Sequence, residues 1–313
     1  MRILVVCSGN APNFDLQKHQ AFIYEQVEAL KQADTTLAVD YFFVRGKGIT
    51  GYLACLSLLL RQLKQHSYHC IHAHVAMSGL LANLQRSVPV VTTFHGSDIN
   101  VPALRIISLL VELLSRQTVY ISQTLADKAI YACRATYSII PCGVDRSLFF
   151  PRPKARCREQ LGLAQDTRYV LFSSAFTNEV KNYPLAKAAV DRLQDERVVL
   201  LELANYTRAE VALLVNAVDV ALMTSFSEGS PQFVKEALAC NCPVVSTDVG
   251  DVRQVLSDIP GCFITSYEPK EVADCLRLVL TNTQPFESSD RINQFDNRLI
   301  TQQVLAVYKS IYS

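Results

Sequence analysis

The sequence lacks a long apolar run, a CxxC pair and an excess of charge of one sign. No apolar run approaches the ~18 residues that a helix needs to span a bilayer, and the first run, residues 3–7, is too short for the core of a signal peptide. The 10 cysteines are scattered singly through apolar stretches, so we interpret them as free thiols of a cytoplasmic protein. No second cluster accompanies Cys240 and Cys242, and no structural metal is expected.

The balance of charge argues against a general nucleic-acid binder, but it is uneven along the chain. The formal net charge is +1, whereas nucleic-acid-binding domains are strongly basic. Residues 1–150 contain 13 basic and 9 acidic side chains, and residues 151–313 contain 17 and 20. The histidines all fall in the first half: His19, His66, His69, His72, His74 and His95. The two halves are therefore expected to differ in function.

Apolar residues make up 50% of the 313 positions, and their order along the chain predicts an α/β protein. Short runs rich in Val and Ile alternate with longer amphipathic stretches, which is typical of parallel sheets covered by helices. Strands are predicted at 2–7, 37–44, 69–73, 88–94, 118–122, 137–141, 169–173, 198–202, 218–223, 243–246 and 262–264. Helices are predicted at 18–31, 52–65, 77–85, 104–116, 125–132, 185–193, 208–215, 232–239, 252–256, 270–280 and 295–311.

This order predicts two doubly wound, Rossmann-like domains. The stretch 151–154 contains two prolines and continues neither a strand ladder nor a helix, so we interpret it as the interdomain connection. The N-terminal domain is placed at 1–152 and the C-terminal domain at 153–291. Residues 292–313 are expected to contain a helix that crosses back onto the first domain.

Loops at the carboxyl ends of the strands are the places to look for a site, and the cleft between two such domains is the default location. The first of these loops, residues 7–12, contains one glycine, Gly9, where a dinucleotide fingerprint needs three. Nicotinamide binding is therefore not expected. Gly9 marks either a ligand-binding loop or a simple hinge turn.

The most specific segment is residues 225–239, which follows a predicted strand. Pro231 suits the first position of a helix, and the free backbone N–H groups there would suit a diphosphate. Glu228 and Glu236 are eight residues apart, or about 12 Å along a helix. The carboxyl groups of a retaining glycosidase lie only ~5–5.5 Å apart, so these glutamates fit two contacts along one extended ligand better than an acid/base pair. The alternative is a capped surface helix with two solvated glutamates.

The run Glu228-Gly229-Ser230-Pro231, continued by Glu236-Ala237-Leu238-Ala239, resembles the E-x7-E signature of family 4 of the retaining glycosyltransferases. Other landmarks of that family match in the expected order, at 92–98, 140–145, 149–151 and 242–250. The resemblance covers nearly the whole chain and is to enzymes of bacterial cell-surface polysaccharide synthesis. It implies the GT-B fold, in which two Rossmann-like domains face a cleft.

The resemblance also implies a function. A hexosyl group would be transferred from a UDP- or GDP-sugar to a glycan or lipid-linked acceptor with retention of configuration, and no metal or other cofactor would be needed. The enzyme would be cytoplasmic, with peripheral contact to the inner face of an anionic membrane as a further expectation. Two alternatives remain: a nucleotide-sugar epimerase, and a non-catalytic subunit that binds nucleotide sugar or glycan.

Roles for individual residues follow from the same resemblance. Lys181 would bind the donor diphosphate, and Gly9 would let the backbone of the first loop approach it. Glu236 would hold the ribose, and Glu228 would contact hydroxyls of the donor sugar. The segment around Gly229, Ser230 and Gln232 would donate backbone amides to sugar or phosphate oxygens. His95 would approach the transferred sugar, and Asp98 would orient sugar or acceptor.

The sequence departs from the family pattern in two loops. An arginine commonly accompanies the lysine, but the loop 173–178 contains none, which is the support for a non-catalytic subunit. The first loop keeps only Gly9 of the usual paired glycines. The alternative for Lys181 is that it is a solvated lysine in a loop and does not bind the diphosphate.

Weaker features leave further alternatives open. His72 and His74 form either a metal pair or, as we favour, hydrogen-bonded histidines at a strand end. Tyr183 and Tyr206 flank the nucleotide base or simply pack. The apolar helices at 52–61 and 104–116 carry sparse basic residues, so they belong to the core or touch an anionic membrane.

Overall fold

The computed structural model describes residues 1–132, 137–288 and 290–311. The chain divides into two compact units: Met1–Gly143 together with the segment that begins at Asn297, and Val144–Asp296. The first unit thus ends before the expected boundary at 152, because the stretch 151–154 is held by the second unit. There the backbone N–H of Arg152 donates to Asn216 Oδ1 at 2.7 Å, and a helix begins at Lys154.

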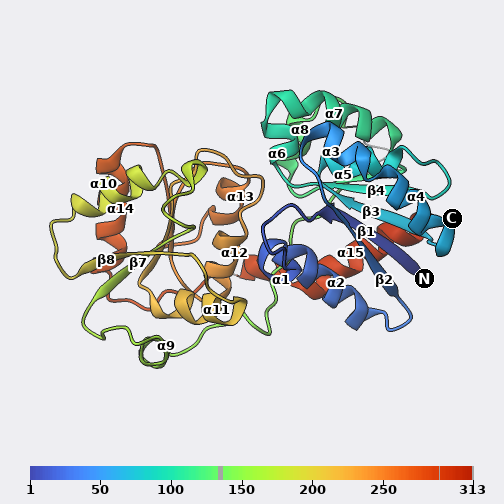
Figure 1. Cartoon of the computed structure of the whole chain (residues 1–313). Helices are drawn as coiled ribbons and strands as arrows, with labels where there is room; N and C mark the ends of the chain where they lie inside the picture. The colour runs from blue at the N-terminus through green and yellow to red at the C-terminus, as the bar shows by residue number, and fades with distance from the viewer. Residues whose placement is uncertain (133–136, 289, 312–313) are drawn as a thin grey trace. The chain divides into compact units, whose positions relative to one another are not determined.

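The sheet of the first unit is parallel throughout its described strands and follows the order β2-β1-β3-β4-β5-β6 (Figure 1). These strands are β1 (Arg2–Ser8), β2 (Ala38–Val44), β3 (Cys70–His74), β4 (Val90–Phe94), β5 (Gln117–Tyr120) and β6 (Tyr137–Ile139). Five consecutive residues of β1, β3 and β4 are buried, as expected for strands covered on both faces.

Helices cover both faces of this sheet. They are α1 (Leu16–His19), α2 (Ala21–Ala33), α3 (Gly48–Ala54), α4 (Leu56–Gln65), α5 (Ala76–Asn83), α6 (Ser97–Asn100), α7 (Pro102–Leu114), α8 (Gln123–Lys128) and α15 (Asn297–Ser310). On one face, α2 and α15 pack over Ile3 and its neighbours. On the other face, α3, α4 and α5 pack over Leu4 and its neighbours. Alternation of side chains along β1 separates these two cores.

The second unit has a parallel sheet in the order β11-β10-β9-β7-β8 among its described strands. The strands are β7 (Arg168–Phe172), β8 (Val198–Glu202), β9 (Val220–Met223), β10 (Val244–Thr247) and β11 (Phe263–Thr265). Its helices are α9 (Lys154–Leu161), α10 (Tyr183–Asp191), α11 (Arg208–Ala217), α12 (Gln232–Ala239), α13 (Val252–Leu256) and α14 (Pro269–Thr281), with 3-10 turns at Glu179–Lys181 and Asp290–Phe295.

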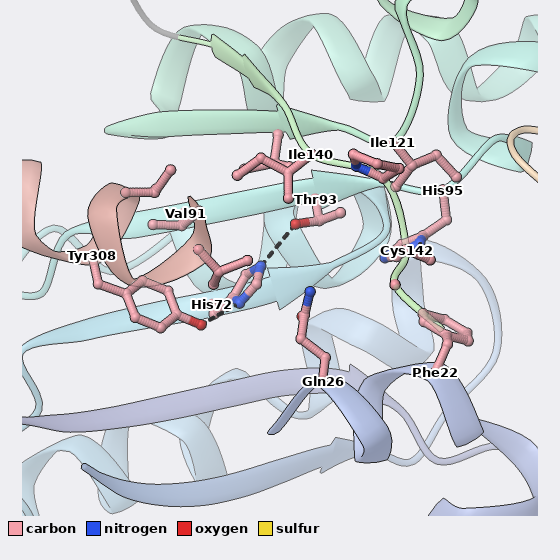
Figure 2. Close-up of a pocket in the computed structure, with 15 residues that line it drawn as sticks. Phe22, Gln26, His72, Val91, Thr93, His95, Ile121, Ile140, Cys142 and Tyr308 are labelled. Carbon is pink, nitrogen blue, oxygen red and sulfur yellow. Dashed lines mark hydrogen bonds between the residues drawn. The ribbon is translucent and has the colours of Figure 1, made fainter. Parts of the chain in front are cut away.

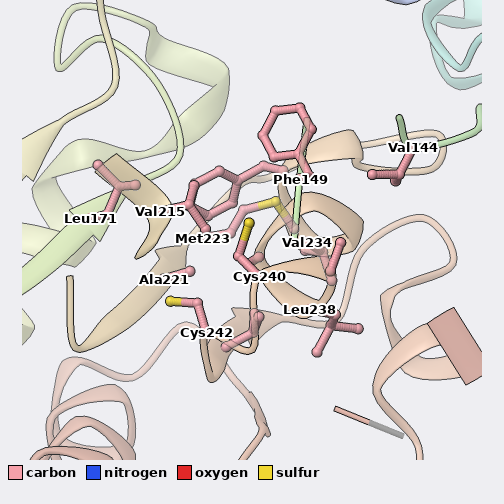
Figure 3. Packing of buried hydrophobic residues seen from close by; sticks show 14 of the residues in the cluster. Val144, Phe149, Leu171, Val215, Ala221, Met223, Val234, Leu238, Cys240 and Cys242 are labelled. Atoms are coloured by element: carbon pink, nitrogen blue, oxygen red, sulfur yellow. The ribbon is translucent and has the colours of Figure 1, made fainter. Parts of the chain in front are cut away.

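The core of the second unit is built from small and sulfur-containing side chains as well as large ones (Figure 3). Cys240 and Cys242, both of which are buried, belong to the same cluster as Phe149, Met223 and Val234. Burial raises the pKa of the Cys240 thiol to about 12, so this side chain stays neutral and inert. The cysteines of the described residues are free, and six of them are buried.

The predicted α/β class and its alternation of elements are confirmed, with local differences. The predicted helix 18–31 is interrupted at Gln20, and the helix 52–65 is interrupted at Cys55. The helix expected at 125–132 ends at Lys128. The short helix α6 and the polar helix α9 were not predicted, because neither shows a clear apolar stripe. Within the described residues, every helix is too short or too polar to cross a membrane.

Candidate functional site

Each sheet has a switch point at which the strand order reverses, and ligands of such sheets bind there, outside the carboxyl ends of the strands. In the second unit the switch point lies between β7 and β9, whose following loops contain Lys181 and Glu228. In the first unit the switch point lies between β1 and β3. Gly9 follows β1, and His74 is the last residue of β3. Most of the predicted site residues therefore lie at or next to a switch point.

The loop after β9 is fixed to its neighbours by buried hydrogen bonds. Thr224 Oγ1 donates to the carbonyl oxygens of Lys181 and Asn182, and the backbone N–H of Phe226 donates to Val180. The carbonyl oxygen of Ser225 accepts from Thr247 at 2.8 Å and Tyr267 at 3.1 Å. These bonds hold the loops after β7 and β9 together before any ligand arrives.

Lys181 and Glu228 form an ion pair at this switch point. Lys181 Nζ lies 2.6 Å from Glu228 Oε1, and Ser225 Oγ donates to the same oxygen at 2.7 Å. Both side chains keep some exposure, 21% for Lys181 and 15% for Glu228. An ammonium group has three N–H donors, so Lys181 can hold Glu228 and an anionic ligand together.

Ser230 belongs to a buried network that also contains Lys235 and Asp251. Lys235 Nζ donates to Ser230 Oγ at 2.6 Å, and Ser230 Oγ donates to Asp251 Oδ2 at 2.5 Å. Lys235 is fully buried and its ammonium group lies 4.7 Å from the centre of the Phe295 ring. Burial raises the pKa of Asp251, and the nearby Lys235 charge opposes that shift. The network fixes the turn before α12 at the predicted anion site.

Gly250 allows the loop after β10 to approach this turn closely. Its φ is +60°, and a Cβ at this position would lie 2.8 Å from the carbonyl oxygen of Gly229. Any L side chain would thus be strained both by conformation and by contact. Gly229, whose amide was predicted to bind donor oxygens, is therefore held by backbone packing.

Glu236 is buried and paired with an arginine that the sequence analysis missed. Arg208 Nη2 donates to Glu236 Oε1 at 2.5 Å, and the Arg208 guanidinium lies 4.7 Å from the centre of the Phe149 ring. Glu236 is 3% exposed, whereas the Arg208 side chain is 28% exposed. Arg208 is the first residue of α11 and follows the loop after β8. It could have been expected near the site, because ligands bind at the loops after the strands of such sheets. The family resemblance predicts an arginine in the loop 173–178 and not at the start of α11.

His95 follows β4 in the first unit and is hydrogen-bonded to a second histidine. His74 Nδ1 and His95 Nε2 are 3.0 Å apart, and the His95 ring lies 4.7 Å from the Phe22 ring. Burial, with the nearby His72 ring, lowers the pKa of His95 to about 3, and the pKa of His74 lies well below its usual value for the same reasons. Both imidazoles are therefore neutral at neutral pH.

The hydrogen bonds of His74 and His95 assign a tautomer to each ring. His74 Nε2 is buried without a hydrogen-bond partner among the described residues. A buried N–H without a partner is rarer than an unpaired acceptor, so we assign the proton of His74 to Nδ1, from which it is donated to His95 Nε2. His95 then carries its own proton on Nδ1, the nitrogen that lies 3.9 Å from Cys142 Sγ.

Asp98 was predicted to orient sugar or acceptor, but its carboxylate is occupied by the backbone. Oδ1 accepts from the N–H of Ala76 at 2.7 Å, and Oδ2 accepts from the N–H of His95 at 2.9 Å. Asp98 is 2% exposed, which leaves it little access to a ligand. The hydrogen bond to Ala76 also helps to hold the preceding residue, Val75, which is β-branched and has the strained φ of +69°. The geometry makes Asp98 a positioning residue for His95.

His72 is not a metal ligand in this arrangement. Its Nδ1 pairs with Tyr308 OH at 2.7 Å and its Nε2 pairs with Thr93 Oγ1 at 2.8 Å (Figure 2). Among the described residues, no group of three or more His, Cys, Asp or Glu side chains is arranged to hold a metal ion. The cavity beside His72 and His95 measures about 10 Å³, enough for about one water molecule.

Two other predicted contacts, Gly9 and Tyr183, have a packing explanation. A Cβ at Gly9 would lie 2.9 Å from Phe43 Cβ, so the packing of β1 against β2 requires a glycine here without any ligand. The Tyr183 ring stacks on Phe176 with 4.1 Å between centres, while Tyr206 remains exposed. Gln232 begins α12. Roles of Gly9, Tyr206 and Gln232 in donor binding stay predictions.

A second cavity lies at the other edge of the sheet of the second unit. It has a volume of about 640 Å³ and is lined by residues that precede β9 and β10, among them Asp219 and Cys242. Because ligands of parallel sheets bind at the carboxyl ends of the strands, we place the candidate site at Lys181 and Glu228 instead.

Two sequence families match the chain in succession. The family described as Glycosyltransferase Family 4 matches residues 4–148, and the one described as Glycosyl transferases group 1 matches residues 178–282. Together they cover most of both units.

Curated relatives of the chain are also named as glycosyltransferases. TuaC of Bacillus subtilis (strain 168), named as a glycosyltransferase of teichuronic acid biosynthesis, is 30% identical over 253 residues, covering 70% of this chain and 64% of TuaC. The D-inositol 3-phosphate glycosyltransferase of Geodermatophilus obscurus is 26% identical over 296 residues, covering 76% of this chain and 66% of that protein. The chain thus spans slightly less than two thirds of the length of these relatives.

Solved structures confirm the predicted GT-B fold. The sucrose-phosphate synthase of Thermosynechococcus elongatus gives a TM-score of 0.83 at 16% identity and covers 99% of each chain. Alr3699/HepE of Anabaena, solved in complex with UDP-glucose, gives a TM-score of 0.78 at 18% identity, covering 99% of this chain and 100% of that one.

Proposed function

Because the chain belongs to glycosyltransferase family 4, we propose that it transfers a hexosyl group from a UDP- or GDP-sugar to a glycan or lipid-linked acceptor, with retention of configuration. The observation that carries the proposal is the Lys181–Glu228 pair at the switch point of the second sheet, where Nζ and Oε1 are 2.6 Å apart. A cation and a carboxylate side by side suit a ligand that joins a diphosphate to a sugar rich in hydroxyl groups. UDP-glucose, bound by Alr3699/HepE, is such a ligand.

In this proposal the second unit binds the donor. Lys181 contacts the diphosphate, together with backbone N–H groups at the start of α12. Glu228 accepts hydrogen bonds from the donor sugar. The free lone pairs of Glu236 accept from the ribose, while Arg208 holds this buried carboxylate in an ion pair. These side chains and backbone groups make all the donor contacts of the proposal, which includes no metal ion.

The transfer step forms one bond and breaks one. The bond between the sugar C1 and the diphosphate oxygen breaks as the acceptor oxygen bonds to C1 from the same face. The departing diphosphate oxygen takes the acceptor proton, which balances the reaction without a protein nucleophile. Lys181 stabilises the negative charge that develops on the leaving group. Neutral His95 contributes a hydrogen bond to the transferred sugar, and Asp98 fixes the backbone from which His95 projects.

The acceptor is proposed from the name of TuaC, which points to a cell-surface polysaccharide. A cytoplasmic location would suit both the supply of nucleotide sugar and the free cysteines, which need a reducing compartment.

The experiment measures release of nucleoside diphosphate from UDP- and GDP-hexoses in the presence of a membrane extract that supplies acceptor. The parent chain should turn over one donor, and Glu236→Ala should lower turnover by about a hundredfold or more. Glu196→Ala, an exposed glutamate in the turn before β8, is the matched control. Anomer analysis of the product tests retention.

Three outcomes would contradict the proposal. Equal turnover by Glu236→Ala and the parent would remove Glu236 from the site. Conversion of the nucleotide sugar to an isomer without acceptor, detected by chromatography, would identify an epimerase. Donor binding without transfer or hydrolysis would identify a non-catalytic subunit.

A further inference from the structure

Two aromatic rings lie exposed at the carboxyl edge of the second sheet. Phe226 belongs to the loop after β9 and is 59% exposed, and Tyr267 belongs to the loop after β11 and is 45% exposed. Their ring centres are 5.6 Å apart and the ring planes differ by 28°, so the two rings stack on each other. We call this pair the aromatic platform. Large aromatic rings that stay in solvent on the ligand side of a parallel sheet have the composition of a binding surface.

Hydrogen bonds to the backbone fix both loops of the aromatic platform. Tyr267 OH donates to the carbonyl oxygen of Ser225 at 3.1 Å, and Thr247 Oγ1 donates to the same oxygen at 2.8 Å. The backbone N–H of Phe226 donates to the carbonyl oxygen of Val180 at 2.9 Å. The platform is therefore formed before a ligand arrives, and a ligand that binds it does not need to order these loops.

The aromatic platform adjoins the Lys181–Glu228 pair. Ser225, which precedes Phe226, donates through Oγ to Glu228 Oε1 at 2.7 Å. Val180, which accepts from Phe226, precedes Lys181. A carboxylate accepts hydrogen bonds from hydroxyl groups, and the slightly negative face of an aromatic ring attracts C–H groups. A pyranose offers both, because hydroxyl groups surround a ring whose faces carry C–H bonds.

The order of the strands separates the aromatic platform from the nucleotide. Arg208, the partner of the proposed ribose ligand Glu236, follows β8. Lys181 follows β7 and Glu228 follows β9, so the proposed contacts run across the sheet from ribose to diphosphate to sugar. Tyr267 follows β11, at the edge of the sheet opposite β8. At about 4.8 Å between neighbouring strands, β8 and β11 are roughly 19 Å apart. The platform therefore continues this series beyond the sugar end of the donor.

We propose that the aromatic platform binds a pyranose ring of the acceptor glycan. The proposal rests on the proposed function, because it uses the donor contacts assigned there. A C–H face of the pyranose stacks on Phe226 and Tyr267, and its hydroxyl groups lie on the side of Glu228. A nucleobase also stacks on aromatic rings, but the base belongs next to the ribose, on the side of Arg208. The second unit thus contributes to recognition of the acceptor in addition to binding the donor.

The first test measures transfer at increasing concentrations of the membrane extract that supplies acceptor. Phe226→Ala should raise the KM for acceptor about threefold to tenfold, and the double variant Phe226→Ala, Tyr267→Ala should raise it further. Calorimetric titration of the nucleotide sugar should give the affinity of the parent for this double variant. Tyr267→Phe keeps the ring, and Thr247 still holds Ser225, so this conservative variant should keep the acceptor KM of the parent.

The second test needs no transfer. Saturation-transfer NMR with methyl β-glucopyranoside and methyl α-mannopyranoside, recorded in the presence of UDP, reports which sugar protons touch the protein. The parent should transfer saturation to the C–H protons of one ring face, and the double variant should lose most of this signal. Leu278 of α14 is 59% exposed, like Phe226, and Leu278→Ala should behave like the parent in both tests. Circular dichroism should show unchanged folding, since every replaced side chain is exposed.

Three results would overturn the proposal. Equal acceptor KM or equal saturation transfer in the double variant and the parent would remove the rings from the acceptor site. A loss of donor affinity as large as the loss of transfer would assign the rings to the donor. A dimer of the parent that becomes a monomer in the double variant, without saturation transfer, would assign them to a second copy of the chain.

Failure of the proposed function has a different signature. If the parent neither binds nor turns over a nucleotide sugar, but shows saturation transfer that the double variant loses, the proposed function fails and the aromatic platform stands as a sugar-binding site.

Discussion

At the carboxyl edge of the second sheet, cationic side chains are held against carboxylates and a hydroxyl, in the pairs Lys181–Glu228, Arg208–Glu236 and Lys235–Ser230. At the corresponding edge of the first sheet, His74 and His95 form a neutral hydrogen-bonded pair, and the carboxylate of Asp98 accepts from the backbone. The first edge thus offers neutral hydrogen-bonding groups, whereas the second concentrates charge.

This distribution of charge between the two edges is opposite to the one that the net charges of the two halves of the chain predict. The first half of the chain carries the basic excess, yet of its exposed basic residues between 41 and 126 just Arg45 and Lys47 lie in a loop that follows a strand. The second half has an acidic excess, but places cations at its switch point. Local contacts, and not the overall balance of charge, decide where an anionic donor would bind.

The largest effect is expected from removing the buried cation of the second edge. Lys235→Met leaves Asp251 buried without its cationic neighbour and should lower the free energy of unfolding by about 3–5 kcal/mol. Urea unfolding followed by circular dichroism measures this, with Lys270→Met as the control, since Lys270 is 80% exposed. A loss below about 1 kcal/mol would show that the network contributes little.

The next effect concerns the neutral histidines of the first edge. Burial lowers the pKa of His72 from 6.5 to about 4, so between these values the unfolded chain binds more protons than the folded one. Stability should therefore be complete above pH 6.5 and should fall as the pH decreases toward 4, by roughly 3 kcal/mol for this group. His72→Gln should reduce this pH dependence, measured as the free energy of unfolding from urea titrations across the same range.

The exposed His66→Gln variant serves as the control and should keep the pH dependence of the parent. If His72→Gln and the parent lost stability in parallel as pH fell, the acid sensitivity would belong to other groups, and the neutral character assigned to the first edge would fail for His72.

A smaller effect tests the packing of the turn at the second edge. Gly250→Ala places a Cβ 2.8 Å from the Gly229 carbonyl oxygen at a φ of +60°, and should cost about 2 kcal/mol of unfolding free energy. Gly162→Ala has a similar φ, +68°, but meets nothing within 4 Å, so it should cost about 1 kcal/mol. Equal losses in the two variants would show that the contact with Gly229 carries no cost.

The alternation of elements was predictable because it is a local property: β-branched runs and amphipathic stretches each mark one strand or one helix. The segment that contains Glu228 was marked because it follows a predicted strand, whereas Lys181 was assigned from the family resemblance. The pairing of His74 with His95 depends on the adjacency of β3 and β4, which strand positions alone do not give.

Other parts of the site depend on tertiary contacts. Lys235 occupies a helix position that looks ordinary in sequence, and only the fold buries it beside Ser230 and Asp251. Arg208 and Glu236 are 28 residues apart and belong to different helices. Asp98 looked available to a ligand because the backbone N–H groups that occupy it come from His95, just after β4, and from Ala76, at the start of α5.

The most direct test of the central claim, that Lys181 at the second edge binds the donor diphosphate, is calorimetric titration of UDP- and GDP-sugars into the parent and Lys181→Met. The variant removes one charge-assisted contact and leaves Glu228 unpaired beside the diphosphate, so it should bind the preferred donor about tenfold to a hundredfold more weakly. Lys187→Met, an exposed lysine of α10, should bind like the parent. Equal affinity of Lys181→Met and the parent, or no binding of either nucleotide sugar by the parent, would contradict the account.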